Sequence, residues 1–314
     1  MHLGRLDLNL LVSLDALLRQ RSVTRAAAEM GLSQPALSAS LARLRRHFDD
    51  ELLTRVGNSY RLTPLAVQLQ DLVRVALSGI ERVFGAQPGF DPARSRREFS
   101  VLASDYVVVV LGDVLARLFA EEAPHARLRF AATSPELVDR AEQVLLGTDL
   151  LLLPHGIVTD LPHRELYRDE WVCVVSADNT AVDTGLTVRH LETLPWVTVY
   201  HGPTAATAAA RQMRMLGIEP HVQVVTESFL TVPGLVAGSD RIALLQRGLV
   251  DLLPLDTGIR ALPVPFEAGP LVEAMWWHPV YDDDPEHRYL RDLVARAAAL
   301  AVEPPTGSAD LAQP

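Results

Sequence analysis

The sequence predicts an α/β protein that carries a small, all-α winged helix-turn-helix domain at its N-terminus. Residues 22–48 have the spacing of two short helices joined by a tight turn. The stretch QPGFDPARSRR (87–97) then marks a domain boundary. From Glu98 onward, short apolar strands alternate with helices, a pattern that predicts parallel sheets with helices on both faces. About 200 residues are enough for two small α/β subdomains.

The two N-terminal helices have clear start signals. Ser22 stands where a helix N-cap is expected, and Gly31 supplies the turn. Ser33 caps the next helix, and Pro35 occupies its first turn, where no backbone donor is lost. A helix before them would brace the pair through leucines at positions 6, 10, 14, 17 and 18. The second helix buries one face made of Leu37, Leu41, Leu44 and Phe48.

A polar stripe beside that apolar face predicts that this helix contacts DNA. Gln34, Ser38 and Arg45 follow one another along it, with Ala42 beside them. Glutamine can pair bidentately with an adenine edge, and small side chains let a helix backbone sink into the major groove. For Gln34 and Ser38 the alternative is an ordinary exposed surface.

A hairpin is expected directly after the helices. The segments Leu53–Val56 and Tyr60–Leu62 flank Gly57-Asn58, a pair suited to a hairpin turn. Arg55 and Arg61 lie on its two arms, where they can reach phosphates or a minor groove.

Charge is distributed unevenly along the chain. The net charge is −10, but residues 1–64 hold nine Arg against six Asp and Glu, a net of +3, so the other 250 residues carry −13. Such asymmetry indicates a basic DNA-binding head on an acidic body. A head with so small a charge should bind weakly alone, which implies a dimer or tetramer.

A long helix begins at Thr63-Pro64, a cap followed by a proline in the first position. It has no evident partner in the sequence. Self-association is therefore the favoured explanation of its apolar positions, and packing on the first helix is the alternative. The apolar residues expected in dimerisation are Leu65, Leu69, Leu72, Ala76, Ile80 and Val83.

Several chemistries are excluded by composition. All 29 basic residues are arginine, so there is no lysine for a phosphate loop, a pyridoxal Schiff base or nucleophilic attack. The single cysteine, Cys173, cannot form an intramolecular disulfide; a buried strand position is the leading interpretation and a redox sensor the alternative. The N-terminus is unlike a signal peptide, and no apolar run reaches the roughly 20 residues of a membrane span. We therefore expect a cytoplasmic protein with no membrane partner.

No motif indicates an enzyme. The sequence has no GxSxG, no HExxH and no paired carboxylates placed by a motif for acid–base work. His278 and His287 flank the acidic run Asp282–Asp284, but their spacing is not that of metal ligands, and a solvated loop is the expected structure. No metal and no cofactor are expected.

The α/β region divides into short elements. The strands are expected near 99–103, 128–131, 149–153, 171–176, 196–200, 222–225, 242–245, 262–264 and 273–277. The helices are expected near 106–120, 135–146, 204–216, 228–237, 247–252 and 285–300. Residues 303–314 are expected to be a disordered tail.

Four strand-to-helix junctions predict a ligand site, because ligands of α/β sheets bind beyond the carboxyl ends of strands. The candidate residues are Ser104, Asp105, Thr133, Ser134, His201, Thr204, Glu227 and Phe229, with Tyr106 and Trp276 as apolar or stacking surface. The alternative for each polar residue is a plain helix cap. Asp105 and Glu227 have no obvious arginine beside them, which disfavours an anionic ligand. We therefore expect a neutral aromatic or phenolic effector.

The N-terminal motif SVTRAAAEMGLSQPALSASLARLR (22–45) resembles that of LysR-type transcriptional regulators, and the likeness extends over nearly the whole chain. The segments LDLNLLVSLDALL (6–18), DRIALLQRGL (240–249) and WHPVYDDDPEHRYLR (277–291) are similar to the branch of nodulation-gene activators and regulators of aromatic degradation. LRRHF (44–48) departs from the wider family, which carries an acidic residue there, but is similar to that branch.

The resemblance implies a DNA-binding transcription regulator that contacts promoter DNA and, in turn, RNA polymerase. It implies a homodimer through the helix Pro64–Phe84, commonly a tetramer, and an effector bound between two lobes shaped like periplasmic solute-binding proteins. On the family pattern the residues that contact DNA are Thr24, Arg25, Ser33, Gln34, Pro35 and Ser38, with Arg55 and Arg61 on the wing.

The expected domain limits are 1–63 for DNA binding, 64–88 for the linker helix and 95–302 for effector binding. Within the last, lobe I covers about 95–168 and 270–302, and lobe II about 169–269. A transport component and a metabolic enzyme are the competing functions; the N-terminal head opposes the first, and the lack of a catalytic constellation opposes the second.

Overall fold

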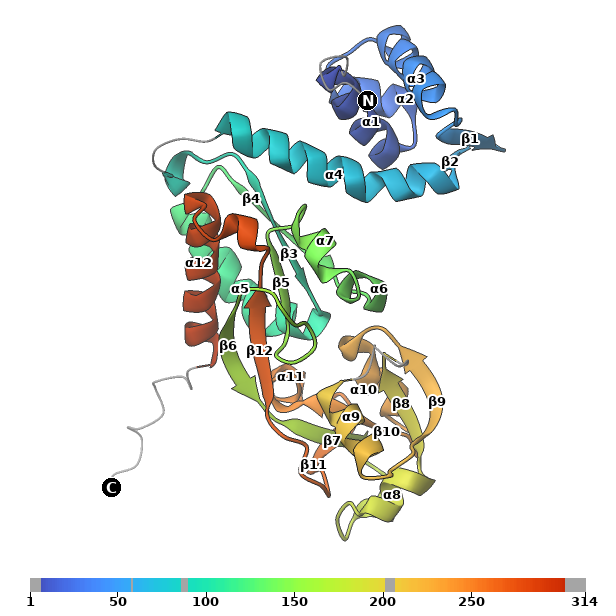
Figure 1. Cartoon of the computed structure of the whole chain (residues 1–314). Helices are drawn as coiled ribbons and strands as arrows, with labels where there is room; N and C mark the ends of the chain where they lie inside the picture. Colours follow the sequence, from blue (N-terminus) through green and yellow to red (C-terminus); the bar gives the residue numbers. More distant parts are fainter. Residues whose placement is uncertain (1–6, 58, 86–89, 201–206, 303–314) are drawn as a thin grey trace. The chain divides into compact units, whose positions relative to one another are not determined.

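The computed structural model describes residues 7–57, 59–85, 90–200 and 207–302 of the chain (Figure 1). The chain forms two compact units, Met1–Pro88 and Gly89–Pro314. His201, Thr204, Asn58 and the tail 303–314 lie outside the described residues. No helix in the described ranges is both long enough and apolar enough to cross a membrane.

The first unit is a helical domain with a two-stranded wing, as predicted. Ser22 accepts a hydrogen bond from the Arg25 backbone N–H at 3.3 Å, and Gly31 turns the chain at φ +64°. Its elements are α1 (Leu8–Gln20), α2 (Val23–Glu29), α3 (Gln34–Phe48), β1 (Leu53–Val56), β2 (Ser59–Leu62) and α4 (Pro64–Gly85).

Helix α4 has two apolar faces. One face packs on this domain's own core through Ala66 and Val73, which are buried. This face contacts α1, which was the alternative to self-association. Leu69 also packs against this core rather than lying on the outer face. The other face is open, since Leu72 is 64% exposed and Val83 is 73% exposed. Of the remaining residues expected in dimerisation, Ala76 is exposed and Leu65 and Ile80 are half-buried.

Lobe I of the second unit is built on a five-stranded sheet in the order β4-β3-β5-β12-β6. Alternate residues of a strand face opposite sides, and this sheet is covered on both. Leu150 and Leu152 pack with α5 and α12, whereas Leu151 and Leu153 pack with α7 (Figure 1). The elements are β3 (Glu98–Ala103), α5 (Asp105–Glu122), β4 (Arg127–Ala132), α6 (Pro135–Val138), α7 (Ala141–Leu145), β5 (Leu150–Pro154), β6 (His163–Asp169), β12 (Leu271–Trp276) and α12 (Pro285–Val302), with short 3-10 turns η2 (Pro92–Arg94) and η5 (Pro279–Tyr281).

Lobe II has a second five-stranded sheet in the order β11-β7-β10-β8-β9. Cys173 is fully buried in its central region, and burial raises the pKa of the thiol to about 12, which fits the buried-strand interpretation. The elements are β7 (Trp171–Ser176), η3 (Thr180–Val182), α8 (Val188–Thr193), β8 (Pro195–Val199), α9 (Ala208–Met215), β9 (His221–Thr226), η4 (Phe229–Thr231), α10 (Val232–Val236), β10 (Ile242–Gln246), α11 (Arg247–Leu252) and β11 (Ile259–Pro263).

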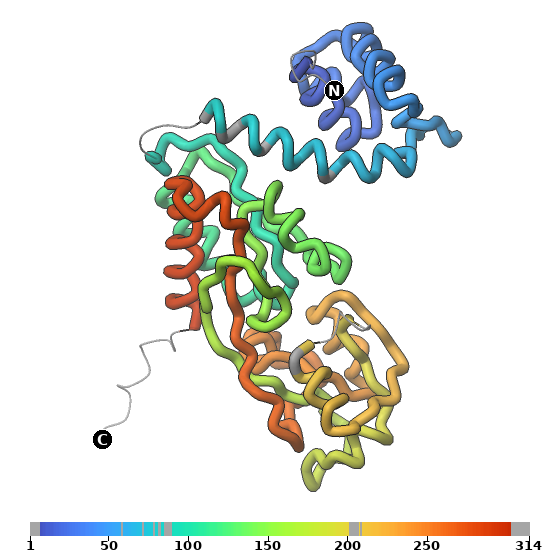
Figure 2. The backbone as a smooth tube through the Cα atoms, viewed as in Figure 1, coloured from blue at the N-terminus to red at the C-terminus, as the bar shows by residue number. Residues whose placement is uncertain are grey.

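Both sheets are mixed, which corrects the expectation of parallel sheets. In lobe I, β12 runs antiparallel to β5 and β6; in lobe II, β7 runs antiparallel to β10 and β11. The reason is the path of the chain, which passes between the lobes at 169–171 and at 263–271 (Figure 2). Strand β7 enters its sheet from lobe I and β12 enters its sheet from lobe II, so neither is joined to a neighbour by the crossover helix that consecutive parallel strands need.

Some elements differ from the expectations. The helix expected over 135–146 is two short helices, α6 and α7, and the one over 228–237 is η4 followed by α10. Strand β6 was not expected, because HRELYRD lies at a sheet edge and is mostly exposed, so it carries no apolar alternation. Helix α8 was also missed, and β11 begins at Ile259 rather than Leu262.

A buried ion cluster joins three elements of lobe I. The Asp149 side chain is only 6% exposed and pairs with the Arg97 guanidinium, which also contacts Glu286 of α12 at 2.9 Å. The other Asp149 oxygen accepts hydrogen bonds from the Ser100 backbone N–H at 2.7 Å and from its hydroxyl at 3.0 Å. The Asp149 and Arg97 side chains together therefore link β3, the start of β5 and α12.

We expect Asp149→Ala to lower the free energy of unfolding by about 3 kcal/mol, because it leaves the largely buried Arg97 guanidinium with only the half-exposed Glu286 as an ion-pair partner and removes the acceptor of the Ser100 N–H. Asp113→Ala is the matched control, since it removes an exposed pair with Arg117 and should change stability by less than about 1 kcal/mol. Urea unfolding of the full chain measures both. Equal losses in the two variants would contradict a structural role for the cluster.

Candidate DNA-contacting helix and effector cleft

Helix α3 presents a polar outer face. Gln34 and Ser38 are exposed, while Leu37 and Leu41 on the opposite side are buried. Ser33 Oγ accepts from the Ala36 backbone N–H at 3.3 Å, so this residue caps the helix. The outer face also includes Pro35 and Ala42, both exposed.

Arg45 is half-buried, and its role in the structure is local. Its Nε donates to the Glu51 carbonyl at 2.8 Å, and its Nη2 donates to the Leu53 carbonyl at 3.1 Å. Nη2 also pairs with the Glu51 carboxylate at 3.0 Å. The side chain therefore ties the end of α3 to the start of the wing, instead of extending along the open face of the helix.

The other candidates for DNA contact lie at the surface of the domain. Arg61 and Thr24 are exposed. Arg55 Nε donates to the Gly57 carbonyl at 3.2 Å across the tip of the wing, and Arg25 Nη2 donates to the Gln20 carbonyl at 2.6 Å. All four remain at the surface, where a phosphate can approach them.

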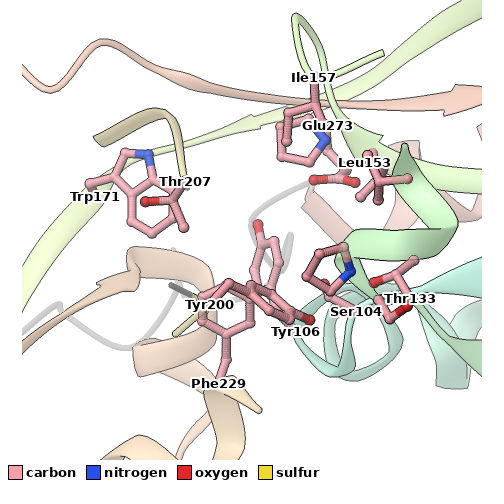
Figure 3. A pocket seen from close by; sticks show the side chains of 14 residues that line it. Ser104, Tyr106, Thr133, Leu153, Ile157, Trp171, Tyr200, Thr207, Phe229 and Glu273 are labelled. Carbon is pink, nitrogen blue, oxygen red and sulfur yellow. The ribbon is translucent and has the colours of Figure 1, made fainter. Parts of the chain in front are cut away.

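A cavity of about 650 Å³, partly open to solvent, lies between the two lobes (Figure 3). Lobe I contributes Ser104, Tyr106, Thr133, Ser134, Pro135, Val138, Leu153, Pro154, Ile157 and Glu273. Lobe II contributes Trp171, Tyr200, Thr207 and Phe229.

Five of the predicted effector residues line this cavity. They are Ser104, Tyr106, Thr133, Ser134 and Phe229. Ser104 and Ser134 are also helix caps, which accept from backbone N–H groups at 3.4 Å, so the expected cap role is present at both. Glu227 is exposed and does not line the cavity.

Asp105 joins the lobes instead of facing the cavity. Its carboxylate, on lobe I, accepts from the Ser228 hydroxyl at 2.6 Å and from the backbone N–H groups of Phe229 and Leu230 at 3.2 and 3.1 Å, all on lobe II. These donors satisfy its charge. Contrary to the expectation from the sequence, the charge of Asp105 is therefore compensated by these donors and gives little reason to exclude an anionic ligand.

Trp276 does not contribute stacking surface to the cavity. Its ring is 1% exposed and packs on the face of the lobe I sheet that α7 covers. Its indole N–H donates to the Leu153 carbonyl at 3.1 Å, and the His163 ring lies 4.5 Å from it. Trp277 points to the opposite side of the strand and donates to Asp282 at 2.7 Å.

Three aromatic rings form one wall of the cavity. Phe229 makes edge contacts with Tyr106 and with Tyr200, at centroid distances of 6.3 and 6.0 Å. The Tyr106 hydroxyl donates to Asp169 at 2.6 Å, so this residue offers the cavity its ring rather than a free hydroxyl. Burial raises the pKa of Tyr106, which keeps the hydroxyl protonated. Tyr200 has φ +59°, a left-handed conformation that side chains other than glycine adopt at an energetic cost.

The ionisable group in the cavity wall is Glu273, which was not among the residues predicted from the sequence. It is 1% exposed, and burial, together with the negative charge of Asp169, raises the pKa of its carboxyl to about 8. Its signal in the sequence is a lone acid in the apolar strand LVEAMW (271–276). No arginine is among the described residues that line the cavity, and no described cluster of His, Cys, Asp and Glu could hold a metal ion.

Comparisons with known proteins agree over almost the full chain. The family described as "Bacterial regulatory helix-turn-helix protein, lysR family" matches residues 8–67, and "LysR substrate binding domain" matches residues 92–299. Nodulation protein D 2 of Rhizobium tropici is 33% identical over 95% of each chain. Nodulation protein D 2 of Bradyrhizobium diazoefficiens is 34% identical over 93% of this chain and 89% of its own.

Solved structures have the same fold. The probable transcriptional regulator PA0477 from Pseudomonas aeruginosa superposes with a TM-score of 0.71 at 27% identity, over 93% of this chain and 97% of that one. Full-length CbnR in complex with its target DNA has a TM-score of 0.64 at 15% identity, over 93% of this chain and all of that one.

The raised pKa of Glu273 predicts a pH-dependent stability. Between the ordinary carboxyl pKa of 4.5 and about 8, the folded state keeps a proton that the unfolded state has lost. The wild-type protein should therefore lose stability relative to Glu273→Gln as pH rises through this window, by up to about 1.4 kcal/mol per pH unit. Urea unfolding at pH 5.5 and 7.5 measures the difference, with Glu142→Gln, an exposed acid, as the control. A difference that is constant with pH would contradict the prediction.

Proposed function

This chain belongs to the LysR family of DNA-binding transcription regulators, and we propose that it regulates a promoter in response to a neutral aromatic molecule. The family has a helix-turn-helix domain and a substrate-binding domain, and its members are regulators rather than enzymes. The observation that carries the proposed effector class is the cavity between the lobes, which has an aromatic wall and no arginine among its described lining residues.

On the DNA side, the exposed face of α3 would enter the major groove. Gln34 and Ser38 are then placed to contact base edges, and Arg55 and Arg61 to contact phosphates. The open face of α4 supports a homodimer, or a tetramer of two dimers, because Leu72 and Val83 are large apolar side chains left in solvent. Two copies would bind two half-sites with partial dyad symmetry. As a regulator of bacterial promoters, the protein would act in the cytoplasm.

Effector binding would act through the geometry of the two lobes. The lobes meet at the cavity, and Asp105 joins them at its edge. A ligand that favours one arrangement of the lobes shifts the population toward it. Such a shift would change the spacing of the DNA-binding domains in the oligomer, and with it the bend of the promoter and its contact with RNA polymerase.

Footprinting on the DNA upstream of the protein's own gene tests the DNA-binding assignment. We expect two protected half-sites about one or more helical turns apart. Gln34→Ala should reduce specific affinity about 10- to 100-fold, which corresponds to the loss of one bidentate base contact. Gln143→Ala, an exposed glutamine on α7, is the matched control and should bind as the wild type does. Full protection by the Gln34 variant would move base contact to another residue.

Thermal unfolding with added ligands tests the effector class. A neutral aromatic probe such as 2-naphthylmethanol should raise the Tm by a few degrees at saturating concentration, because it binds only the folded state. Ile157→Arg, which places a cationic side chain in the cavity wall, should abolish that rise, and Val188→Arg, an exposed position on α8, should not. Tight binding of a small dicarboxylate such as adipate would overturn the proposed class.

A further inference from the structure

Glu273 has no structural partner that explains its presence. It lies within β12, opposite Pro154 of β5 and Tyr167 of β6. Although it is 1% exposed, neither carboxyl oxygen has a hydrogen-bond partner in the described part of the chain. The other five residues of this strand are apolar. An apolar side chain would satisfy the fold at least as well.

The burial of an unpaired carboxyl at Glu273 points to a ligand. A buried polar group without a partner destabilises the folded state, so nearly all such groups in native proteins are satisfied. Glu273 lines the cavity, and Figure 3 shows its carboxyl directed into it. Trp171, on the lobe II side of the same cavity, also has an indole N–H without a partner. Two unsatisfied polar groups therefore border one apolar space.

We propose that Glu273 determines the specificity of the cavity by exchanging hydrogen bonds with a hydroxyl group on an uncharged aromatic effector. This inference rests on the proposed function, and it names the chemical group that the cavity recognises. The aromatic wall would bind the ring system, and the carboxyl would select among ligands that have similar rings.

The surroundings of Glu273 favour a hydroxyl over a charged group. No described arginine lines the cavity, so a carboxylate ligand would face an acid without compensation. Burial, together with the negative charge of Asp169, raises the pKa of Glu273 to about 8, which keeps its carboxyl protonated at neutral pH. The Tyr167 hydroxyl, which also faces Glu273, has a pKa raised by burial and stays neutral. A protonated carboxyl has one donor and an acceptor oxygen, and a hydroxyl group has both as well. An ammonium ligand would instead need the carboxyl to lose its proton.

Such a site should discriminate strongly. A ligand that lacks the hydroxyl leaves the buried carboxyl unsatisfied in the complex, whereas a ligand that supplies it removes the penalty. The discrimination depends on one side chain, because the rest of the lining around it is mainly apolar or aromatic.

The experiment is calorimetric titration of the full-length protein with four compounds on one ring frame. They are 2-naphthylmethanol, 2-methylnaphthalene, 2-naphthylmethylamine and 2-naphthoate. We expect the alcohol to bind at least tenfold more tightly than the methyl compound and more tightly than either charged compound. The alcohol does not ionise, so a decline in its affinity as pH rises above about 8 would report on the protein.

Two variants assign the preference to Glu273. Glu273→Gln keeps a donor and an acceptor, so it should keep the preference for the alcohol and lose its decline above pH 8. Glu273→Leu should bind the alcohol and the methyl compound equally. Its Tm should not fall below that of the wild type, because the substitution removes an unsatisfied buried group.

Each other outcome overturns the inference in a distinct way. Equal binding of the alcohol and the methyl compound by the wild type would leave an aromatic cavity in which Glu273 has no role in selection. A preference that persists in Glu273→Leu would place selection elsewhere. Tighter binding of the ammonium compound would make the site a cation site. Failure of all four compounds to bind would overturn the aromatic effector class itself, while the footprint would still test the DNA-binding function independently.

Discussion

The two passages of the chain between the lobes, at 169–171 and 263–271, are the constraint on which the effector domain depends. Asp169 lies at the first passage and accepts hydrogen bonds from the Tyr106 hydroxyl at 2.6 Å and from the Gly248 backbone N–H at 3.1 Å. A Cβ at position 248 would lie 2.8 Å from an Asp169 oxygen, so a larger residue there would displace this carboxylate from its hydrogen bonds. The passages make both sheets mixed and bring Trp171 and Glu273 to one cavity.

The polar groups of the cleft fall into two classes that differ in function. Ser104 and Ser134 complete helix ends, and Asp105 joins one lobe to the other through three donors. These groups are satisfied by the protein. Glu273 and Trp171 have no hydrogen-bond partner in the described part of the chain, which destabilises the folded state. In our proposal, a ligand that supplies the missing hydrogen bond recovers this free energy on binding. Buried polar groups without partners are expected mainly at binding sites, where the rest of the domain supplies the stability.

In the N-terminal domain, helices α3 and α4 each have one face packed in the core and one face exposed to solvent. Helix α3 buries leucines on one side and leaves Gln34 and Ser38 on the other. Helix α4 packs Ala66 and Val73 on its own domain and leaves Leu72 and Val83 exposed. The long apolar pattern of α4 therefore serves two surfaces, which is why sequence spacing alone could not choose between packing on α1 and self-association.

Local signals determined most of the fold. Caps such as Ser22 and Ser33, the turn at Gly31 and the periodic leucines of α3 act within a few residues, so the helix-turn-helix and its family could be predicted directly. The polar candidates at strand ends were found in the same way, and three of them, Ser104, Thr133 and Ser134, line the cavity.

Only the tertiary structure decided which side chains face the cavity. Trp276 and Glu273 belong to one strand, yet Trp276 packs beneath α7 and Glu273 lines the cavity. Which residues of β12 are covered depends on the helices that pack on each face of the sheet, and those helices come from other parts of the chain. The edge strand β6 has no apolar pattern, so its pairing with β12 could not be predicted. Whether Glu273 has a hydrogen-bond partner depends on residues such as Tyr167 and Asp169, about a hundred positions earlier in the chain. The sequence around Glu273 therefore could not show that its carboxyl is unsatisfied.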